Sequence, residues 1–297
     1  MRIRIGIVMG VGILVIGVLA WPMAEPARPY DVVSFAEGAG SLGWADFPKL
    51  AALAFLTGLA GYFISFPYGR QLGVLVVPAG LSIWALRGGR MASLMICRSD
   101  VSQQAQLLGQ LKWEPLVWLA IVLAGCAGAY FTGILDYIKA LKDKEKPALS
   151  RGRAVNILIG LVCSLLLVHF CINLLVRDVS LYDRQLGTVT GQPQVAQIAF
   201  GVAAAFCLAA FVMKRFLHIG FIWPMAASGL IAAFSTAIYT RQDVLEYILR
   251  VWPGSFFANS VASVLAVQMV SFGSLGAIAG YWLAVRYDFI KSKQKPD

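Results

Sequence analysis

Residues 155–176 read VNILIGLVCSLLLVHFCINLLV, 22 consecutive residues without one Asp, Glu, Lys or Arg. An α-helix needs about 20 such residues to cross the hydrocarbon core of a bilayer. Backbone polar groups inside that core must bond within their own segment, so a helix is expected here rather than a strand. The stretch therefore predicts a membrane-spanning helix.

Further apolar runs lie on both sides of Val155–Val176 and raise the predicted number of membrane helices to eight. They are Ile5–Trp21, Leu50–Phe66, Leu72–Leu86, Leu116–Leu135, Val195–Val212, Ile219–Tyr239 and Phe256–Val285. The chain of 297 residues is 59% hydrophobic and 13% charged, roughly half the charged fraction of a soluble domain. We therefore expect an all-α fold, a polytopic transmembrane helix bundle.

The net charge of +10 is expected to report the orientation of the chain in the membrane. With eight helices and a cytoplasmic N-terminus, the cytoplasmic loops and tails carry 15 basic and 5 acidic residues, and the outer loops carry ten of each. The positive-inside rule then places both termini in the cytoplasm. This asymmetry and the short loops favour a bacterial inner membrane as the compartment.

The two halves of the chain present the same features in the same order. Each half begins with Arg-x-Arg before its first apolar run, at Arg2 and at Arg151. Each half ends its fourth run with Asp-aromatic-Ile-Lys, at Asp136 and at Asp288. Because internal repeats decide the architecture of a fold, this shared order is an important observation.

We therefore expect two four-helix transmembrane repeats, residues 1–149 with a basic cytoplasmic linker and residues 150–297. Four crossings is an even number, so both repeats must insert in the same orientation, related by a pseudo-twofold axis along the membrane normal. The first run could be a cleaved signal peptide. Its counterpart Val155–Val176 is internal, so we interpret Ile5–Trp21 as a retained helix.

Proline and glycine mark positions of expected irregularity and close packing. Pro78 and Pro224 are expected to break the third helix of each repeat, because proline has no backbone N–H. Small residues allow neighbouring membrane helices to approach closely. The glycines expected to pack the fourth helix of each repeat, rather than to form an oligomer face, are Gly125, Gly128, Gly273, Gly276 and Gly280.

Three polar side chains form a stripe on the outer half of the fifth predicted helix. His169, Asn173 and Arg177 follow one another at intervals of four residues. Polar groups inside a membrane are costly, which makes them functional candidates. The alternative is that His169 and Asn173 hydrogen-bond to neighbouring helices while Arg177 reaches the headgroups.

Two outer segments, 100–113 and 243–252, have apolar residues at helical spacing and are expected to lie flat on the outer surface. Their charged residues form a candidate docking site for another protein. These are Arg98, Asp100, Arg241 and Asp243. The alternative is that these charges are simply solvated.

The sequence lacks the residues that several kinds of catalysis and metal binding require. No acidic residue lies in the middle of a predicted helix, and the chain has two histidines, so we predict no catalytic residue, no metal site and no cofactor. The basic segments 139–153 and 291–295 are expected to contact anionic lipid headgroups on the cytoplasmic side. Nucleic acid is not expected as a partner, because no aromatic residues accompany these charges.

Together these features favour a non-catalytic membrane subunit or scaffold with protein partners in a membrane complex. One alternative is a small-solute transporter with a path between the repeats, which predicts a water-filled cavity reaching Pro78, Pro224 or His169. Another is an intramembrane enzyme using His169 and Arg177, which predicts an acidic or nucleophilic neighbour for His169. A scaffold predicts a dry seam packed by glycine.

Overall fold

The computed structural model describes residues 2–28, 31–36, 40–96, 101–141, 151–177, 179–183, 187–191, 193–241, 243–244, 246–247 and 259–293. The first half contains α1 (Arg2–Gly12), the π-helix η1 (Ile13–Leu19), α2 (Trp21–Ala24), the 3₁₀ turn η2 (Trp44–Asp46), α3 (Phe47–Ile64), α4 (Gly69–Leu72), the 3₁₀ turn η3 (Gly73–Leu75), α5 (Val76–Arg87), α6 (Met91–Ile96), α7 (Val101–Leu111) and α8 (Glu114–Leu141). The second half contains α9 (Arg151–Leu175), β1 (Val179–Asp183), β2 (Gly187–Gly191), α10 (Val195–Leu217), α11 (Ile222–Tyr239) and α13 (Ala266–Lys293).

Six helical segments among the described residues are long and apolar enough to cross a membrane. They are Trp44–Ile64, Gly69–Arg87, Ala105–Phe131, Ala154–Leu175, Val195–Leu217 and Ala266–Lys293. Two further apolar helices, Ile3–Leu19 and Ile222–Ile238, are shorter than these six, so the count of eight membrane helices stays a prediction. The prediction of a multi-pass helical membrane protein is confirmed at this level.

The surface of α9 has the character expected of a lipid-facing helix. Leu158, Leu166 and Leu174 are 64%, 67% and 68% exposed, although they belong to one of the most apolar segments of the chain. In water such a face would be an aggregation hazard, whereas lipid chains solvate it without cost. The apolar exposure therefore fits a helix that borders the bilayer.

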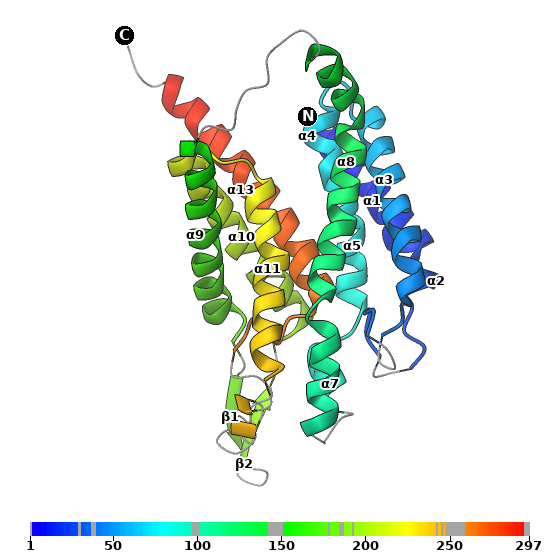
Figure 1. The fold of residues 1–297 in the computed structure, drawn as a ribbon, viewed down its shortest axis with the longest axis vertical. Coiled ribbons are helices and arrows are strands. Elements are labelled where there is room, and N and C mark those ends of the chain that lie inside the picture. Colours follow the sequence, from blue (N-terminus) through cyan, green and yellow to red (C-terminus); the bar gives the residue numbers. More distant parts are fainter. Residues whose placement is uncertain are drawn as a thin grey trace.

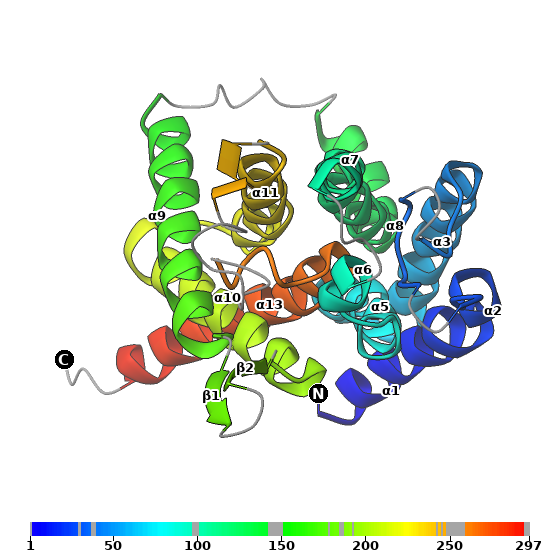
Figure 2. The same cartoon turned by 90° about the horizontal axis from the view of Figure 1, so that it is seen from below.

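The helices separate into two groups that follow the sequence. Helices α1 to α8 lie on one side of the bundle and α9 to α13 on the other (Figures 1 and 2). The start of α1 and the end of α13 lie at the same end of the bundle, here called the terminal end. The opposite end carries α7 and the β-hairpin and is called the hairpin end.

The two groups meet mainly through α13 and α11 of the second group. The helix α13 packs against both α5 and α8 of the first group, and α11 packs against α8. The inner helix α13 is therefore shared by both halves of the core, and 72% of its most apolar stretch is buried inside the protein. The core of the fold is centred on α13, α8 and α5.

The structure differs from the sequence prediction in several places. Within the expected run Phe256–Val285, α13 begins at Ala266, residues 259–264 form turns and bends, and residues 256–258 lie outside the described residues. The described residues also contain a short antiparallel hairpin, β1–β2, with Val179 opposite Gly191, in the connection between α9 and α10, while the bundle itself is helical as predicted. A short polar, glycine-containing connection between two spans can form paired strands. A hydropathy pattern identifies the apolar spans but does not detect this strand pairing.

The expected surface helix of segment 100–113 is also corrected. The helix α7 does not lie flat across the bundle but continues roughly along the direction of α8 (Figure 1). Its Leu107, Leu108 and Leu111 are buried, and α7 packs against α11. The apolar face that suggested membrane contact is thus covered by the protein itself. Most of the second segment, 243–252, lies outside the described residues.

Candidate functional site

A buried carboxyl group lies at the start of α8. Glu114 is 2% exposed. The hydroxyl of Ser34 donates a hydrogen bond of 2.6 Å to its Oε2, and the indole N–H of Trp118 donates one of 2.7 Å to its Oε1. The backbone N–H of Phe35 bonds to the same carboxyl group. Three neutral donors from two parts of the chain therefore converge on Glu114.

Aromatic rings enclose this carboxyl cluster. The ring of Trp118 lies 5.2 Å from that of Phe35 and 6.3 Å from that of Trp84, the latter in an edge-to-face arrangement. All three rings are almost fully buried. Such packing excludes water and so strengthens the hydrogen bonds to the carboxyl group. The cluster holds segment 31–36 against α5 and α8.

Glu114 is not among the residues predicted from the sequence. It lies just before the apolar run Leu116–Leu135, outside the middle of any predicted helix, where a buried carboxyl group was sought. A signal was available in the spacing, because Glu114 and Trp118 stand four residues apart and so share a helix face. The partner Ser34 could not be found in this way, since it lies 80 residues away.

A second buried polar side chain joins the two halves. Gln268 is fully buried near the start of α13. Its amide donates to the backbone carbonyls of Ala85 and Gly89, at 3.1 and 3.3 Å, which lie at and just after the end of α5. Its Oε1 accepts from the backbone N–H of Leu265 at 3.2 Å. Gln268 thus caps the start of its own helix and ties it to α5.

The glycines of α13 lie in direct contact with the backbone of α10. A methyl group added at Gly276 would overlap the carbonyl of Ala203, and one at Gly280 would overlap the carbonyl of Cys207. Gly273 faces the rings and side chains of Phe206 and Ser228. These two helices therefore approach at backbone distance, which only glycine permits.

The first half contains a similar seam between α3 and α8. A methyl group at Gly128 would overlap the carbonyl of Phe55, and one at Gly58 would overlap the carbonyl of Gly125. A third close crossing joins α1 to α5, where Gly12 meets the carbonyl of Val76. Gly125 and Gly128 of α8 thus lie inside the protein.

The polar stripe of α9 faces the outside of the bundle. His169 is exposed, and the amide of Asn173 lies 3.0 Å from its Nε2. The side-chain oxygen of Asn173 accepts a hydrogen bond of 3.1 Å from the backbone N–H of Ser260. Arg177 is exposed at the end of the helix. Asn173 therefore ties α9 to the segment that precedes α13.

The candidate docking residues are only partly described. Arg98 and Asp100 lie outside the described residues. Arg241 and Asp243 bond to each other at 3.4 Å, and both side chains are about 70% exposed, at 69% and 72%. An exposed pair at this distance contributes little to stability.

The two prolines occupy the same position in their helices. Pro78 is the third residue of α5, which begins at Val76, and Pro224 is the third residue of α11, which begins at Ile222. In the first turn of a helix the backbone N–H has no partner within the helix, so proline is tolerated there. Neither proline therefore breaks the helix that contains it, although the 3₁₀ turn η3 precedes α5 inside the span Gly69–Arg87.

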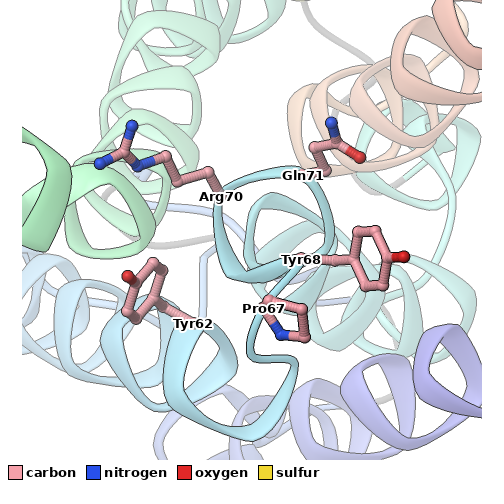
Figure 3. Close-up of a pocket in the computed structure, with 5 residues that line it drawn as sticks. All are labelled: Tyr62, Pro67, Tyr68, Arg70 and Gln71. Carbon is pink, nitrogen blue, oxygen red and sulfur yellow. The ribbon is translucent and has the colours of Figure 1, made fainter. Parts of the chain in front are cut away.

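A small pocket opens at the terminal end, between the end of α3 and the start of α4. It has a volume of about 320 Å³ and is lined by Tyr62, Pro67, Tyr68, Arg70 and Gln71 (Figure 3). Nearby, Arg4 of α1 donates a hydrogen bond of 2.9 Å to the carbonyl of Phe66. The lining is thus polar and carries a guanidinium group.

No family model, no curated protein and no solved structure matches the chain. Within the described residues, no group of three or more His, Cys, Asp or Glu side chains is placed to hold a metal ion.

Proposed function

We propose that the chain is a non-catalytic subunit or scaffold of a membrane complex, built from two repeats. The repeats are residues 1–149 and 150–297, standing side by side with the same orientation. The terminal end would face the cytoplasm of a bacterial cell, as the excess of basic residues there favours. The segments 139–153 and 291–295 would meet anionic lipids on that side.

The contacts between the two groups of helices support the repeat. The fourth helix of the second repeat, α13, packs against the third helix of the first, α5. Reciprocally, the fourth helix of the first repeat, α8, packs against the third helix of the second, α11. In addition, α13 packs against α8. Reciprocal contacts of this kind are what a pseudo-twofold axis between α8 and α13 produces.

The helix pairs within each group support the same relation. The second and fourth helices of each repeat, α3 with α8 and α10 with α13, meet at glycine seams. An ancestral four-helix unit with such a seam would pass it to both copies. The residue positions of the two seams have drifted, as expected of an old duplication.

The single observation that carries the scaffold proposal is the filled seam between the halves. Gln268 spans it with bonds to two backbone carbonyls. Farther along, Gly229 of α11 lies close to the Leu119 side chain and the Pro115 carbonyl of α8. A transporter would need a path with polar, hydrated walls between the two halves. A scaffold instead needs the tight helix packing that is found there.

The features expected of the other functions do not gather at this seam. Pro78 and Pro224 are buried on α5 and α11, and His169 is exposed on α9. The hydrogen-bond partner of His169 among the described residues is Asn173, an amide that neither attacks a substrate nor moves a proton readily. We therefore do not favour the enzyme.

One observation favours the transporter as second candidate. The π-helix η1 and the 3₁₀ turn η3 lie in neighbouring segments of the first half, and η1 packs directly against α5. Interrupted helices in contact are a common feature of substrate sites in transporters, and π-segments are often functional.

Purification from native membranes in a mild detergent distinguishes the two. We expect a tagged chain to recover defined protein partners in fixed ratio. We also expect a photo-crosslinking amino acid at an exposed apolar position, such as Leu56, Leu166 or Phe200, to form a protein adduct at one position at least. The same group at the buried Val267 is the control and should react only within the chain. A lone, monodisperse protein without adducts would contradict the scaffold and favour the transporter.

A further inference from the structure

His169 is exposed on α9 at a depth where hydrocarbon surrounds the protein. The helix α9 lies at the edge of the bundle in Figure 2, and only 22% of the most apolar stretch of its span, Ala154–Leu175, is buried. At about 1.5 Å per residue, His169 stands about 9 Å from Leu175 and about 22 Å from Ala154, the two ends of this span. The hydrocarbon core is about 30 Å thick. An imidazole at this depth is too short to reach the headgroups, as Lys and Arg do near helix ends.

The hydrogen bonds around His169 determine which ring nitrogen carries the hydrogen. The backbone N–H of Ser260 donates to Oδ1 of Asn173 at 3.1 Å, which fixes the orientation of the Asn173 amide. The NH₂ group of that amide then donates to Nε2 of His169 at 3.0 Å. In a neutral imidazole one nitrogen accepts and the other donates. Nε2 is therefore the acceptor, and Nδ1 carries the N–H.

This Nδ1–H has no acceptor among the residues that the structure describes. Acyl chains offer none either, and a polar group without a partner in hydrocarbon is strongly unfavourable. The large exposed side chains around His169 on α9 are apolar, namely Val162, Leu166, Phe170 and Leu174. The helix thus presents a single hydrogen-bond donor within an apolar face.

The donor at Nδ1 restricts which molecule can cover this face. A second copy of the chain, related by a twofold axis, would place one Nδ1–H against another. The acceptors at this depth, Nε2 of His169 and Oδ1 of Asn173, are already engaged within the chain. A helix of another protein has its backbone carbonyls bonded internally, so its acceptor must be a side chain. Polar side chains of this kind join helices across membrane interfaces.

We propose that the face of α9 around His169 binds a transmembrane helix of a different protein, and that this helix carries a side-chain oxygen that accepts a hydrogen bond from Nδ1 of His169. Leu166, Phe170 and Leu174 pack against the same helix, while His169 fixes its depth and rotation. A single polar residue in an apolar contact sets register in this way. The inference rests on the proposed function, because it locates the partner contact of the membrane complex.

Photo-crosslinking of the full chain in native membranes tests the proposal. A benzophenone amino acid in place of Phe170, the exposed neighbour of His169, should form an adduct with one other protein. Peptide mapping should place the adduct in a membrane-spanning segment, within one helical turn of a Ser, Thr, Asn, Gln, Asp or Glu side chain. The same group at the exposed Leu56 of α3 is the control, and its adducts should not depend on His169.

Substitutions of His169 separate the two ring nitrogens. The amide of His169→Asn places an N–H near the position of Nδ1, whereas the longer amide of His169→Gln reaches the position of Nε2. From the strength of interhelical hydrogen bonds, His169→Leu and His169→Gln should lower an unsaturated adduct yield at Phe170 by roughly three- to fifteenfold. His169→Asn should retain most of the yield. Because His169 is exposed, all three variants should keep a thermal unfolding midpoint close to that of the wild type.

Several results would overturn the proposal. These are an adduct at Phe170 with a second copy of the chain, an adduct with lipid alone, and equal yields in the wild type and His169→Leu. The proposed function survives each of them if the same preparation recovers partner proteins that crosslink at another position, such as Leu56 or Phe200. A lone chain without protein adducts at any position would contradict the proposed function and this inference together.

Discussion

Replacing Gly280 by alanine is expected to destabilise the protein strongly for so small a change. The added methyl group would overlap the backbone carbonyl of Cys207, which cannot turn aside as a side chain can. Overpacking of this kind costs about 1–3 kcal/mol, which exceeds the gain of up to about 1 kcal/mol from the higher helix propensity of alanine. We expect a clear fall in the thermal unfolding midpoint in detergent.

The control for Gly280→Ala is Gly10→Ala. Gly10 also lies inside a helix, α1, but no atom stands within 4 Å of an added methyl group. This variant should be as stable as the wild type or slightly more stable. The added methyl group meets no neighbouring atom, so the only remaining effect is the higher helix propensity of alanine. If both variants unfold at the same temperature, α13 and α10 do not touch at backbone distance, and the seam described above is incorrect.

The second large effect is expected at Glu114. Replacement by alanine leaves the Ser34 hydroxyl, the Trp118 indole and the Phe35 N–H without their acceptor inside the protein. Each buried donor without a partner costs about 1–3 kcal/mol. Because the Ser34 hydroxyl can rotate toward another acceptor, we expect a total loss of about 3 kcal/mol in the free energy of unfolding.

Two further variants make the Glu114 experiment specific. Glu114→Gln keeps the shape and one acceptor oxygen, so it should lose clearly less stability than Glu114→Ala. Glu25→Ala removes an exposed carboxyl group and should change stability by less than about 0.5 kcal/mol. The measurement is chemical unfolding in detergent followed by tryptophan fluorescence, since Trp118 itself reports the cluster. A Glu114→Ala variant as stable as Glu25→Ala would show that the carboxyl cluster does not hold segment 31–36.

Much of the helical framework could be predicted from the sequence, because hydropathy acts within a segment. The run Val155–Val176 corresponds closely to α9, Arg151–Leu175. The prediction was less accurate where the chain turns inside an apolar stretch. The run beginning at Phe256 becomes α13 only from Ala266, and the residues just before it form turns. An apolar composition does not distinguish a buried turn from a buried helix.

The start of α11 illustrates the same limit. His218 adopts a left-handed conformation, with φ of 53°, and ends α10. The chain therefore needs a new helix start, and Pro224 falls into the first turn rather than the middle of a span. Glycine is the usual residue in this conformation. Histidine is enriched among the other residue types that adopt it, but most histidines do not, so the residue type alone does not predict the turn.

The partners of the buried polar groups could not be predicted either. Gln268 bonds to carbonyls of Ala85 and Gly89, nearly two hundred residues earlier in the chain, at separations of 183 and 179. Backbone carbonyls carry no sequence signature, since every residue has one. Only the fold identifies their partners. The roles of His169 and of Arg241 stay predictions.

The most direct test of the account is the labelling of single cysteines by a membrane-impermeant maleimide in intact bacterial cells. The chain would carry one cysteine at Arg2, at Lys293 or at the exposed Tyr182 of the hairpin, with the native cysteines replaced by serine. Two four-pass repeats of equal orientation predict that the cysteine at 182 is labelled, and that those at 2 and 293 react only after the membrane is permeabilised. Labelling of position 2 or position 293 in intact cells would place a terminus outside and contradict the account.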